Sequence, residues 1–245
     1  MMLCGGFATR LEPISHFMPK ALLPLGDGRP IAEHILDDLL DSGVKEIIIS
    51  TNAKFLGQFD YWMKNVSSRQ SVKMDLVVEN TMSNDEKFGA IRGINYAIKN
   101  ARISTDLLIV ASDNLYDFSA KDAITEFSRH RNPVVGLYDI NSIEEAKKFG
   151  SVELDNGKII SFEEKPKKPR STLISTGIYV FPKESLGKFD EYLNDGNNPD
   201  APGYFIKWLS ENTEVRGHVY HGKWCDVGTL ESYRKVFDDY GKKGR

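Results

Sequence analysis

Residues 29–50 read RPIAEHILDDLLDSGVKEIIIS, and this stretch indicates the fold class. Pro30 suits the first turn of a helix, and apolar residues then recur every three or four positions as far as Leu40. This pattern predicts an amphipathic helix that ends near Ser42, where Gly43 is a typical stop. The β-branched run that follows predicts a buried strand over residues 44–50. Residues 29–50 therefore form one helix–strand unit.

The same alternation extends to both sides of this unit. A short apolar run at Met1–Cys4 precedes it, and the predicted elements that follow are helices at 55–66, 90–99 and 120–129 and strands at 74–78, 107–110 and 134–138. Such an alternation predicts a Rossmann-like α/β fold, in which a mixed, mostly parallel sheet has helices on both faces. Ligands bind beyond the carboxyl ends of the strands in these sheets, where Gly5-Gly6 and Asp113 are expected to lie.

The pattern changes near Gly150. Residues 151–163 predict a β-hairpin with an Asn156-Gly157 turn, and the remaining predicted elements are strands at 174–181 and 215–220 and helices at 183–194, 204–211 and 230–240. Residues 194–203 are rich in Gly, Pro, Asn and Asp and predict a surface loop. We expect an antiparallel extension of one sheet in a single domain over residues 1–240, followed by a frayed tail at 241–245.

Composition excludes several classes of function. The 245 residues carry a formal net charge of −3, which indicates neither a nucleic-acid partner nor a membrane-binding patch. No apolar run is long enough to span a bilayer, and no signal peptide precedes the first motif. Cys4 and Cys225 form neither a disulfide framework nor a metal-ligand spacing, so we expect two reduced thiols in a cytoplasmic protein.

The first candidate site lies near the N-terminus. Residues 3–11 read LCGGFATRL and residues 19–24 read PKALLP. A glycine pair after a strand allows backbone N–H groups to approach a phosphate, and Arg10 and Lys20 add two cations. The segment matches neither a P-loop nor a dinucleotide-binding fingerprint. Taken alone, the glycine pair is equally consistent with a tight turn among solvated charges.

These two stretches together resemble the signature of the sugar nucleotidyltransferases, in which LAGGxGTRL is followed by PKxLLP. Five later segments match the same family in order: ASDN at 111–114, FGSVE at 149–153, FEEKP at 162–166, STGIY at 175–179 and WCDVGT at 224–229. Within the family, the chain is most similar to glucose-1-phosphate thymidylyltransferases and uridylyltransferases. The resemblance implies that a sugar 1-phosphate, with glucose expected, and a nucleoside triphosphate, dTTP or UTP, give a nucleotide sugar and pyrophosphate.

The resemblance also implies roles for individual residues. Those that would bind the nucleotide are Gly5, Gly6, Thr9, Arg10, Lys20, Gly89 and Asp113. Arg10 would stabilise the leaving pyrophosphate and Lys20 would contact the α-phosphate, while Asp113 and Asp226 would hold Mg2+. Residues expected at the sugar phosphate are Gly150, Glu164, Lys165 and Thr176, with Lys165 gripping the phosphate. Cations at these places are chemically reasonable, because the reaction brings anionic oxygens onto an anionic phosphate.

Structural readings remain open for three of these residues. Asp113 and Asp226 also suit helix or turn caps, and Lys165 lies in a charged turn that is typical of protein surfaces. Arg10, Lys20 and Lys165 are the residues expected to act in catalysis.

Some segments depart from the family pattern. Ala8 replaces a glycine of the signature, and the base-contacting segment expected between Glu79 and Ala90 does not align with the family motif. The nucleobase therefore stays open. The alternatives are a mannose-1-phosphate guanylyltransferase, a phosphocholine cytidylyltransferase-like enzyme, or an inactive regulatory subunit that binds nucleotide. Family members are often dimers or tetramers, which leaves a homo-oligomer open.

Overall fold

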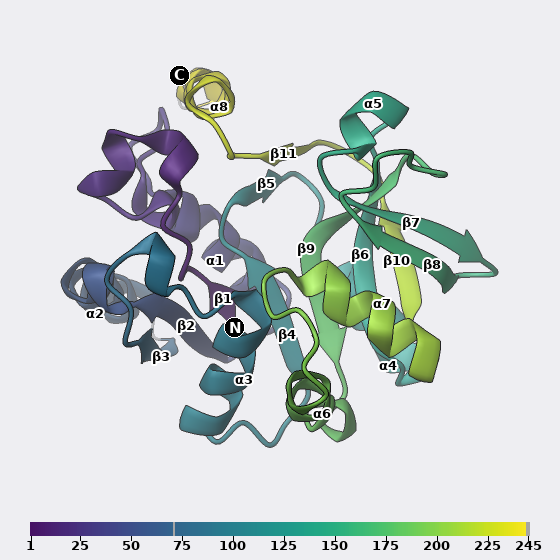
Figure 1. The fold of residues 1–245 in the computed structure, drawn as a ribbon. Helices are drawn as coiled ribbons and strands as arrows, with labels where there is room; N and C mark the ends of the chain where they lie inside the picture. Colours follow the sequence, from purple (N-terminus) through teal and green to yellow (C-terminus); the bar gives the residue numbers. More distant parts are fainter. Residues whose placement is uncertain (71, 244–245) are drawn as a thin grey trace. The chain divides into compact units, whose positions relative to one another are not determined.

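The computed structural model describes residues 1–70 and 72–243, and these form the predicted mixed α/β fold (Figure 1). The chain divides into two compact units. The N-terminal unit comprises Met1–Lys87, Ala111–Ser119 and Lys223–Arg245, and the central unit comprises Phe88–Val110 and Ala120–Gly222. The single domain expected over residues 1–240 stays a prediction.

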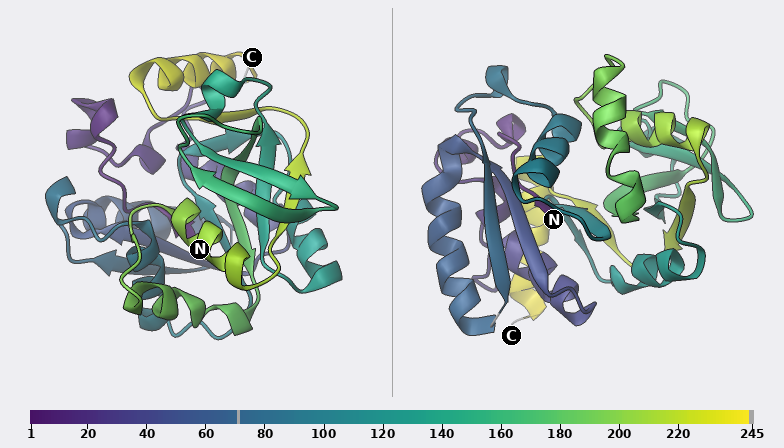
Figure 2. Two further views of the ribbon diagram at one scale, coloured as in Figure 1. Left: turned by 45° about the vertical axis from the view of Figure 1, so that its right-hand side comes forward. Right: turned by 90° about the horizontal axis from the view of Figure 1, so that it is seen from below.

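The N-terminal unit contains a parallel sheet in the order β3-β2-β1. Its strands are β1 (Met2–Leu3), β2 (Glu46–Asn52) and β3 (Lys73–Glu79). Its two main helices are α1 (Ile31–Asp41) and α2 (Leu56–Gln70), and α2 packs along β3 (Figure 2). The short 3-10 helices of this unit are η1 (Thr9–Leu11), η2 (Ile14–His16), η3 (Lys20–Leu22), η4 (Ala53–Phe55) and η5 (Asn84–Glu86). The parallel βα arrangement expected from residues 29–50 is confirmed here.

A second sheet in the N-terminal unit was not predicted. Its antiparallel strands are β5 (Asn114–Tyr116) and β11 (Trp224–Asp226), and α8 (Leu230–Lys243) follows (Figure 1). The helix extends to Lys243, beyond its predicted end at Tyr240; Gly244 and Arg245 lie outside the described residues. Gly26 accommodates this helix, because a Cβ there would lie only 2.2 Å from the Phe237 carbonyl oxygen.

The central unit contains a sheet in the order β4-β9-β6-β10-β8-β7. Its elements are β4 (Leu107–Ala111), β6 (Val134–Asp139), β7 (Gly150–Asp155), β8 (Lys158–Glu164), β9 (Leu173–Phe181), β10 (Arg216–Tyr220), α3 (Ala90–Asn100), α4 (Lys121–His130), α5 (Ile143–Ala146), η6 (Lys183–Ser185), α6 (Lys188–Asn194) and α7 (Pro202–Asn212). β9 runs antiparallel to β4, β6 and β7, whereas β10 is parallel to β6. Antiparallel pairing in this unit is therefore more extensive than the predicted hairpin. The β7–β8 hairpin has its turn at Asn156 (φ 49°) and Gly157 (φ 78°), as predicted.

An aromatic cluster holds α6 and α7 against β9. Phe189 stacks on Phe205 with ring centroids 4.1 Å apart, and Phe181 meets Phe189 edge-on at 5.3 Å. Offset and edge-on pairs of buried rings add to the stability that burial itself provides. The helix predicted over 183–194 is instead split into η6 and α6, and Gly187 lies at the break.

The predicted surface loop between α6 and α7 has a structural role. The carbonyl oxygens of Pro199 and Asp200 accept hydrogen bonds from the first N–H groups of α3, those of Ile91 and Ala90. These N–H groups have no partners within a helix, so the loop acts as the N-terminal cap of α3. Gly89 (φ 81°) permits this approach, because a Cβ there would lie 2.5 Å from the Pro199 oxygen.

No helix within residues 1–70 and 72–243 is long and apolar enough to cross a membrane.

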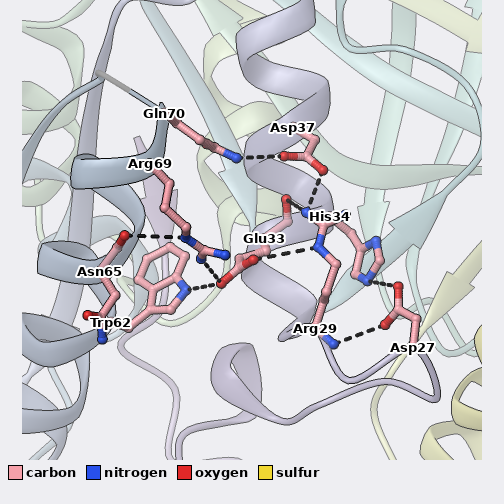
Figure 3. A network of polar contacts seen from close by, with 9 residues as sticks. All are labelled: Asp27, Arg29, Glu33, His34, Asp37, Trp62, Asn65, Arg69 and Gln70. Carbon is pink, nitrogen blue, oxygen red and sulfur yellow. Dashed lines mark hydrogen bonds and ion pairs between the residues drawn. The ribbon is translucent and has the colours of Figure 1, made fainter.

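A polar network joins α1 to α2 in the N-terminal unit (Figure 3). Glu33 lies at its centre and is only 6% exposed. The Glu33 carboxylate accepts hydrogen bonds from Arg69 at 2.9 Å and from the Trp62 indole at 3.3 Å. Arg29 lies 3.5 Å from the other carboxylate oxygen and also bonds Asp37. The buried charge of Glu33 is thus matched by two cations and a neutral donor.

We predict that Glu33→Ala lowers the free energy of unfolding by roughly 2–3 kcal/mol, since the Trp62 N–H loses its buried acceptor and both arginines lose their partner. Chemical denaturation measures this effect. Asp60→Ala is the matched control, because the Asp60–Lys64 pair is solvent-exposed and should change stability by less than about 0.5 kcal/mol. Equal effects of the two substitutions would contradict the role of Glu33.

Candidate active site

The glycine loop, residues 5–11, follows β1 directly. Asn52 at the end of β2 donates its side-chain N–H to the Gly5 carbonyl at 3.0 Å, and Cys4 N–H bonds Ser50 O at 2.7 Å. Ala8 adopts the left-handed conformation (φ 49°, ψ 43°) that favours glycine. Gly6, Thr9 and Arg10 are exposed. Hydrogen bonds thus hold the start of the loop to β2, while residues further along it are exposed to solvent.

Lys20 and Asp113 form an ion pair in the same unit. The Lys20 Nζ lies 2.8 Å from Asp113 Oδ2, and the two side chains are 15% and 34% exposed. The other carboxylate oxygen accepts a hydrogen bond from the Asn114 side chain at 3.0 Å. Two of the predicted nucleotide-binding residues, 93 positions apart, are therefore in direct contact.

Asp226 lies beside Asp113 because β11 pairs with β5. Asp226 is opposite Asn114 in the register, and Val227 N–H donates to the Asp113 carbonyl at 2.8 Å. Gly228 then provides room for two side chains, since a Cβ there would lie 2.4 Å from Asp226 Oδ2 and 3.3 Å from Arg10 Nη2.

This donor set suits a divalent cation. Asp113, directly before β5, and Asp226, at the end of β11, supply hard carboxylate oxygens, and Mg2+ typically takes one or two protein carboxylates and leaves its other positions to phosphate and water. Among residues 1–70 and 72–243, no group of three or more His, Cys, Asp or Glu side chains forms a metal cluster. A magnesium site here would therefore depend on oxygens from its substrates, and metal binding stays a prediction.

The predicted sugar-phosphate residues lie in the central unit, at the ends of β7 and β8. The Glu164 carboxylate lies against two glycines: a Cβ on Gly203 would come within 2.0 Å of its Oε2, and one on Gly150 within 3.3 Å. Burial raises the pKa of Glu164 above its usual range, partly offset by Lys165. Lys165 is exposed, adopts a left-handed φ of 46° and has its Nζ 3.9 Å from Glu164 Oε1.

Thr176 is placed differently from its neighbours in this set. It is 1% exposed, and its hydroxyl donates to the Gly136 carbonyl at 2.9 Å. This hydrogen bond links β9 to β6. Thr176 could therefore bind a sugar only through its backbone groups, or through its hydroxyl if the hydroxyl left the Gly136 carbonyl. Its role in sugar binding stays a prediction.

Glu79 is the residue that the sequence did not single out within its predicted base-contacting segment. It ends β3, is 8% exposed, and its Oε1 would lie 3.2 Å from a Cβ on Gly5. Burial raises the pKa of its carboxyl group to about 7. A polar residue at the carboxyl end of a predicted parallel strand was the available signal.

The predicted residues thus fall into two sets. In the N-terminal unit are Gly5, Gly6, Thr9, Arg10, Lys20, Asp113 and Asp226, and in the central unit are Gly89, Gly150, Glu164, Lys165 and Thr176. Cys4 and Cys225 are free thiols, as expected.

The sequence model of the nucleotidyl transferase family matches residues 1–243. The chain belongs to this family. Its resemblance to sugar nucleotidyltransferases, inferred from the six motifs, is confirmed by the relatives it matches.

Two curated relatives illustrate the range of the family. The chain is 29% identical over 236 residues to a putative mannose-1-phosphate guanyltransferase of Sulfolobus acidocaldarius, covering 96% of this chain and 61% of that protein. It is 28% identical over 251 residues to a glucose-1-phosphate adenylyltransferase of Mycoplasma mobile, covering 95% of this chain and 64% of that protein. The chain thus spans less than two thirds of the length of these relatives.

Solved structures show the same fold. A putative glucose-1-phosphate thymidylyltransferase from Bacillus anthracis, in complex with sucrose, superposes with a TM-score of 0.83 at 22% identity, covering 97% of this chain and 92% of that one. A UDP-glucose pyrophosphorylase complexed with UDP-glucose gives a TM-score of 0.81 at 19% identity, covering 99% and 97%. At these identities the likeness establishes the fold alone.

We predict that Ala8→Gly raises the free energy of unfolding by about 1 kcal/mol, because glycine adopts the left-handed conformation without steric cost. Thermal and chemical denaturation measure the change. The control is Ala101→Gly at the end of α3, where φ is −81° and glycine should destabilise. If Ala8→Gly destabilises as much as the control, the strain at Ala8 is disproved.

Proposed function

We propose that this chain is a sugar nucleotidyltransferase, in which an oxygen of a sugar 1-phosphate attacks the α-phosphorus of a nucleoside triphosphate. The new bond joins the two phosphates, the bond from the α-phosphorus to the β-phosphate oxygen breaks, and pyrophosphate leaves. The observation that carries this proposal is the convergence of Lys20, Asp113, Asp226 and Arg10 beside the glycine loop.

Each group of the N-terminal unit has a role in this reaction. The N–H groups of Gly5, Gly6 and the following residues would bind the triphosphate, with Thr9 in the same loop. Lys20 would contact the α-phosphate and neutralise part of its charge, and Arg10 would stabilise the departing pyrophosphate. Asp113 and Asp226 would hold Mg2+, which when bound neutralises charge on the phosphates.

The central unit would bind the second substrate. Exposed Lys165 offers a cation for the sugar phosphate, and the Glu164 carboxylate offers hydrogen-bond acceptors for sugar hydroxyls. The left-handed backbone of Lys165 is the strained geometry often found at functional positions. Because Gly150 has no side chain, the space beside the Glu164 carboxylate stays free of side-chain atoms from this position.

The choice of substrates is a finer question. The sequence motifs favour glucose 1-phosphate with dTTP or UTP. Relatives named for mannose and guanine or for glucose and adenine keep the mannose-1-phosphate guanylyltransferase alternative open. An inactive regulatory subunit is less well supported, because Arg10, Lys20, Asp113, Lys165 and Asp226 are all present. Pyrophosphate release over a panel of triphosphates and sugar 1-phosphates tests the proposal.

We predict that Asp113→Asn and Asp226→Asn each reduce pyrophosphate release by ~100-fold or more, because each removes half of the carboxylate charge available to the metal. Mn2+ binding, followed by electron paramagnetic resonance with nucleotide present, should weaken in parallel. Asp60→Asn on the exposed surface of α2 is the control. The metal assignment is falsified if full activity survives in excess EDTA.

We predict that Lys165→Ala lowers kcat/KM by ~100- to 1,000-fold and leaves the thermal midpoint nearly unchanged, because an exposed lysine contributes charge to the site and little to the core. Steady-state kinetics with the sugar phosphate varied measure this. Lys167→Ala in the same turn is the matched control, since its side chain is also exposed. Near-normal kinetics of Lys165→Ala would show that the lysine is only a surface charge.

A further inference from the structure

Three buried residues with side-chain oxygens lie at the carboxyl ends of β2 and β3. They are Asn52, Glu79 and Thr81, which are 0%, 8% and 2% exposed. Asn52 and Glu79 are directly paired in the parallel register, and Thr81 O accepts from Ala53 N, which follows Asn52. We call Asn52, Glu79 and Thr81 the acceptor cluster, because the oxygens of an amide, a carboxylate and a hydroxyl can each accept a hydrogen bond.

The side-chain oxygens of the acceptor cluster lack hydrogen-bond partners among the described residues. Asn52 Oδ1 and Thr81 Oγ1 lack a hydrogen-bond partner within residues 1–70 and 72–243, and burial is the only cause that raises the pKa of Glu79. Within the same part of the chain, the Glu79 carboxylate makes no ion pair or hydrogen bond. Buried polar groups are nearly always satisfied, and an unmet buried acceptor lowers stability.

Glu33 shows what a structural buried glutamate looks like in this protein. Its exposure is similar to that of Glu79, yet it is surrounded by Arg29, Arg69 and the Trp62 indole (Figure 3). Glu79 has no comparable partners, so its position is not explained by packing of the unit. A ligand that donates hydrogen bonds would supply what the cluster lacks.

The acceptor cluster lies directly against the glycine loop. Glu79 Oε1 would be 3.2 Å from a Cβ on Gly5, and the Asn52 side-chain N–H holds the Gly5 carbonyl at 3.0 Å. In the proposed function this loop binds a nucleoside triphosphate. The part of the nucleotide next to the cluster must then offer hydrogen-bond donors, and a base edge can offer two N–H donors side by side, which suits the two oxygens of a carboxylate.

We infer that the acceptor cluster selects guanine, with the Glu79 carboxylate accepting from the ring N1–H and the 2-amino group together; this inference rests on the proposed function. Guanine is the common base with two adjacent donors on one edge, and a carboxylate accepts two such bonds side by side. Uracil and thymine place a single N–H between two carbonyl oxygens, which a carboxylate repels. Adenine and cytosine place an amino donor next to a ring-nitrogen acceptor.

The test measures nucleotide binding by calorimetry, separately from catalysis. The full chain is titrated with GTP, ITP, ATP, CTP, UTP and dTTP in the presence of Mg2+. We expect GTP to bind roughly 10- to 100-fold more tightly than UTP or dTTP, and ITP, which lacks the 2-amino group, to lie between them. The comparison of GTP with ITP uses the unaltered chain and therefore does not depend on a variant that folds.

Glu79→Gln provides a reciprocal test. A glutamine offers one acceptor and one donor, which match the N–H and carbonyl of uracil or thymine. This variant should lose roughly 10- to 100-fold in GTP affinity and gain affinity for UTP. Glu46→Gln, an exposed glutamate at the start of β2, is the control and should leave the order of affinities unchanged.

Three outcomes would overturn the inference. Equal affinities for GTP and ITP would exclude the 2-amino contact. Tightest binding of UTP, dTTP, ATP or CTP by the unaltered chain would exclude guanine selection, while pyrophosphate release with that nucleotide would still support the proposed function. Absence of binding to every triphosphate would contradict both.

Discussion

The candidate active site depends on the pairing of β5 with β11, which closes with the 2.8 Å hydrogen bond from Val227 N–H to the Asp113 carbonyl. This short sheet joins segments that are more than a hundred residues apart. Asp226 and Gly228 are carried to Asp113 by it, and Arg10 then meets Gly228. Without the pairing, Asp113 would lie in the turn after β4 with Lys20 as its partner, and one carboxylate with one lysine would form only an ion pair.

A second constraint recurs at three carboxylates of the candidate site, each of which lies against a glycine. Glu79 faces Gly5, Asp226 faces Gly228, and Glu164 faces Gly150 and Gly203. The Cβ of any other residue would approach these oxygens to between 2.0 and 3.3 Å. Glycine thus allows a carboxylate to lie close to the backbone while its own surroundings stay open to a ligand. Burial raises the pKa of Glu79 and Glu164, which is typical of groups arranged for function rather than stability.

Backbone strain also occurs at the candidate functional positions. Ala8 in the glycine loop and Lys165 beside Glu164 both have left-handed φ values, 49° and 46°, although each has a side chain. At Ala8 the methyl group stands where the family signature has glycine, so the loop keeps its conformation against a local cost. Lys165 follows directly after the end of β8, and its side chain is 66% exposed. Such positions persist only where the surrounding structure holds them.

The sequence by itself determined the family, the parallel strands and helices around residues 29–50, and the turn at Asn156-Gly157, because periodicity and turn chemistry act between residues close in the chain. Motif order also identified the candidate residues. Tertiary structure alone decided the β5–β11 pairing, the docking of residues 199–200 on α3, the broken helix near Gly187 and the burial of Thr176. It also separated two buried glutamates that look alike in sequence, since Glu33 has partners and Glu79 has none among the described residues. Burial and hydrogen-bond satisfaction depend on contacts between distant segments, which local patterns do not encode.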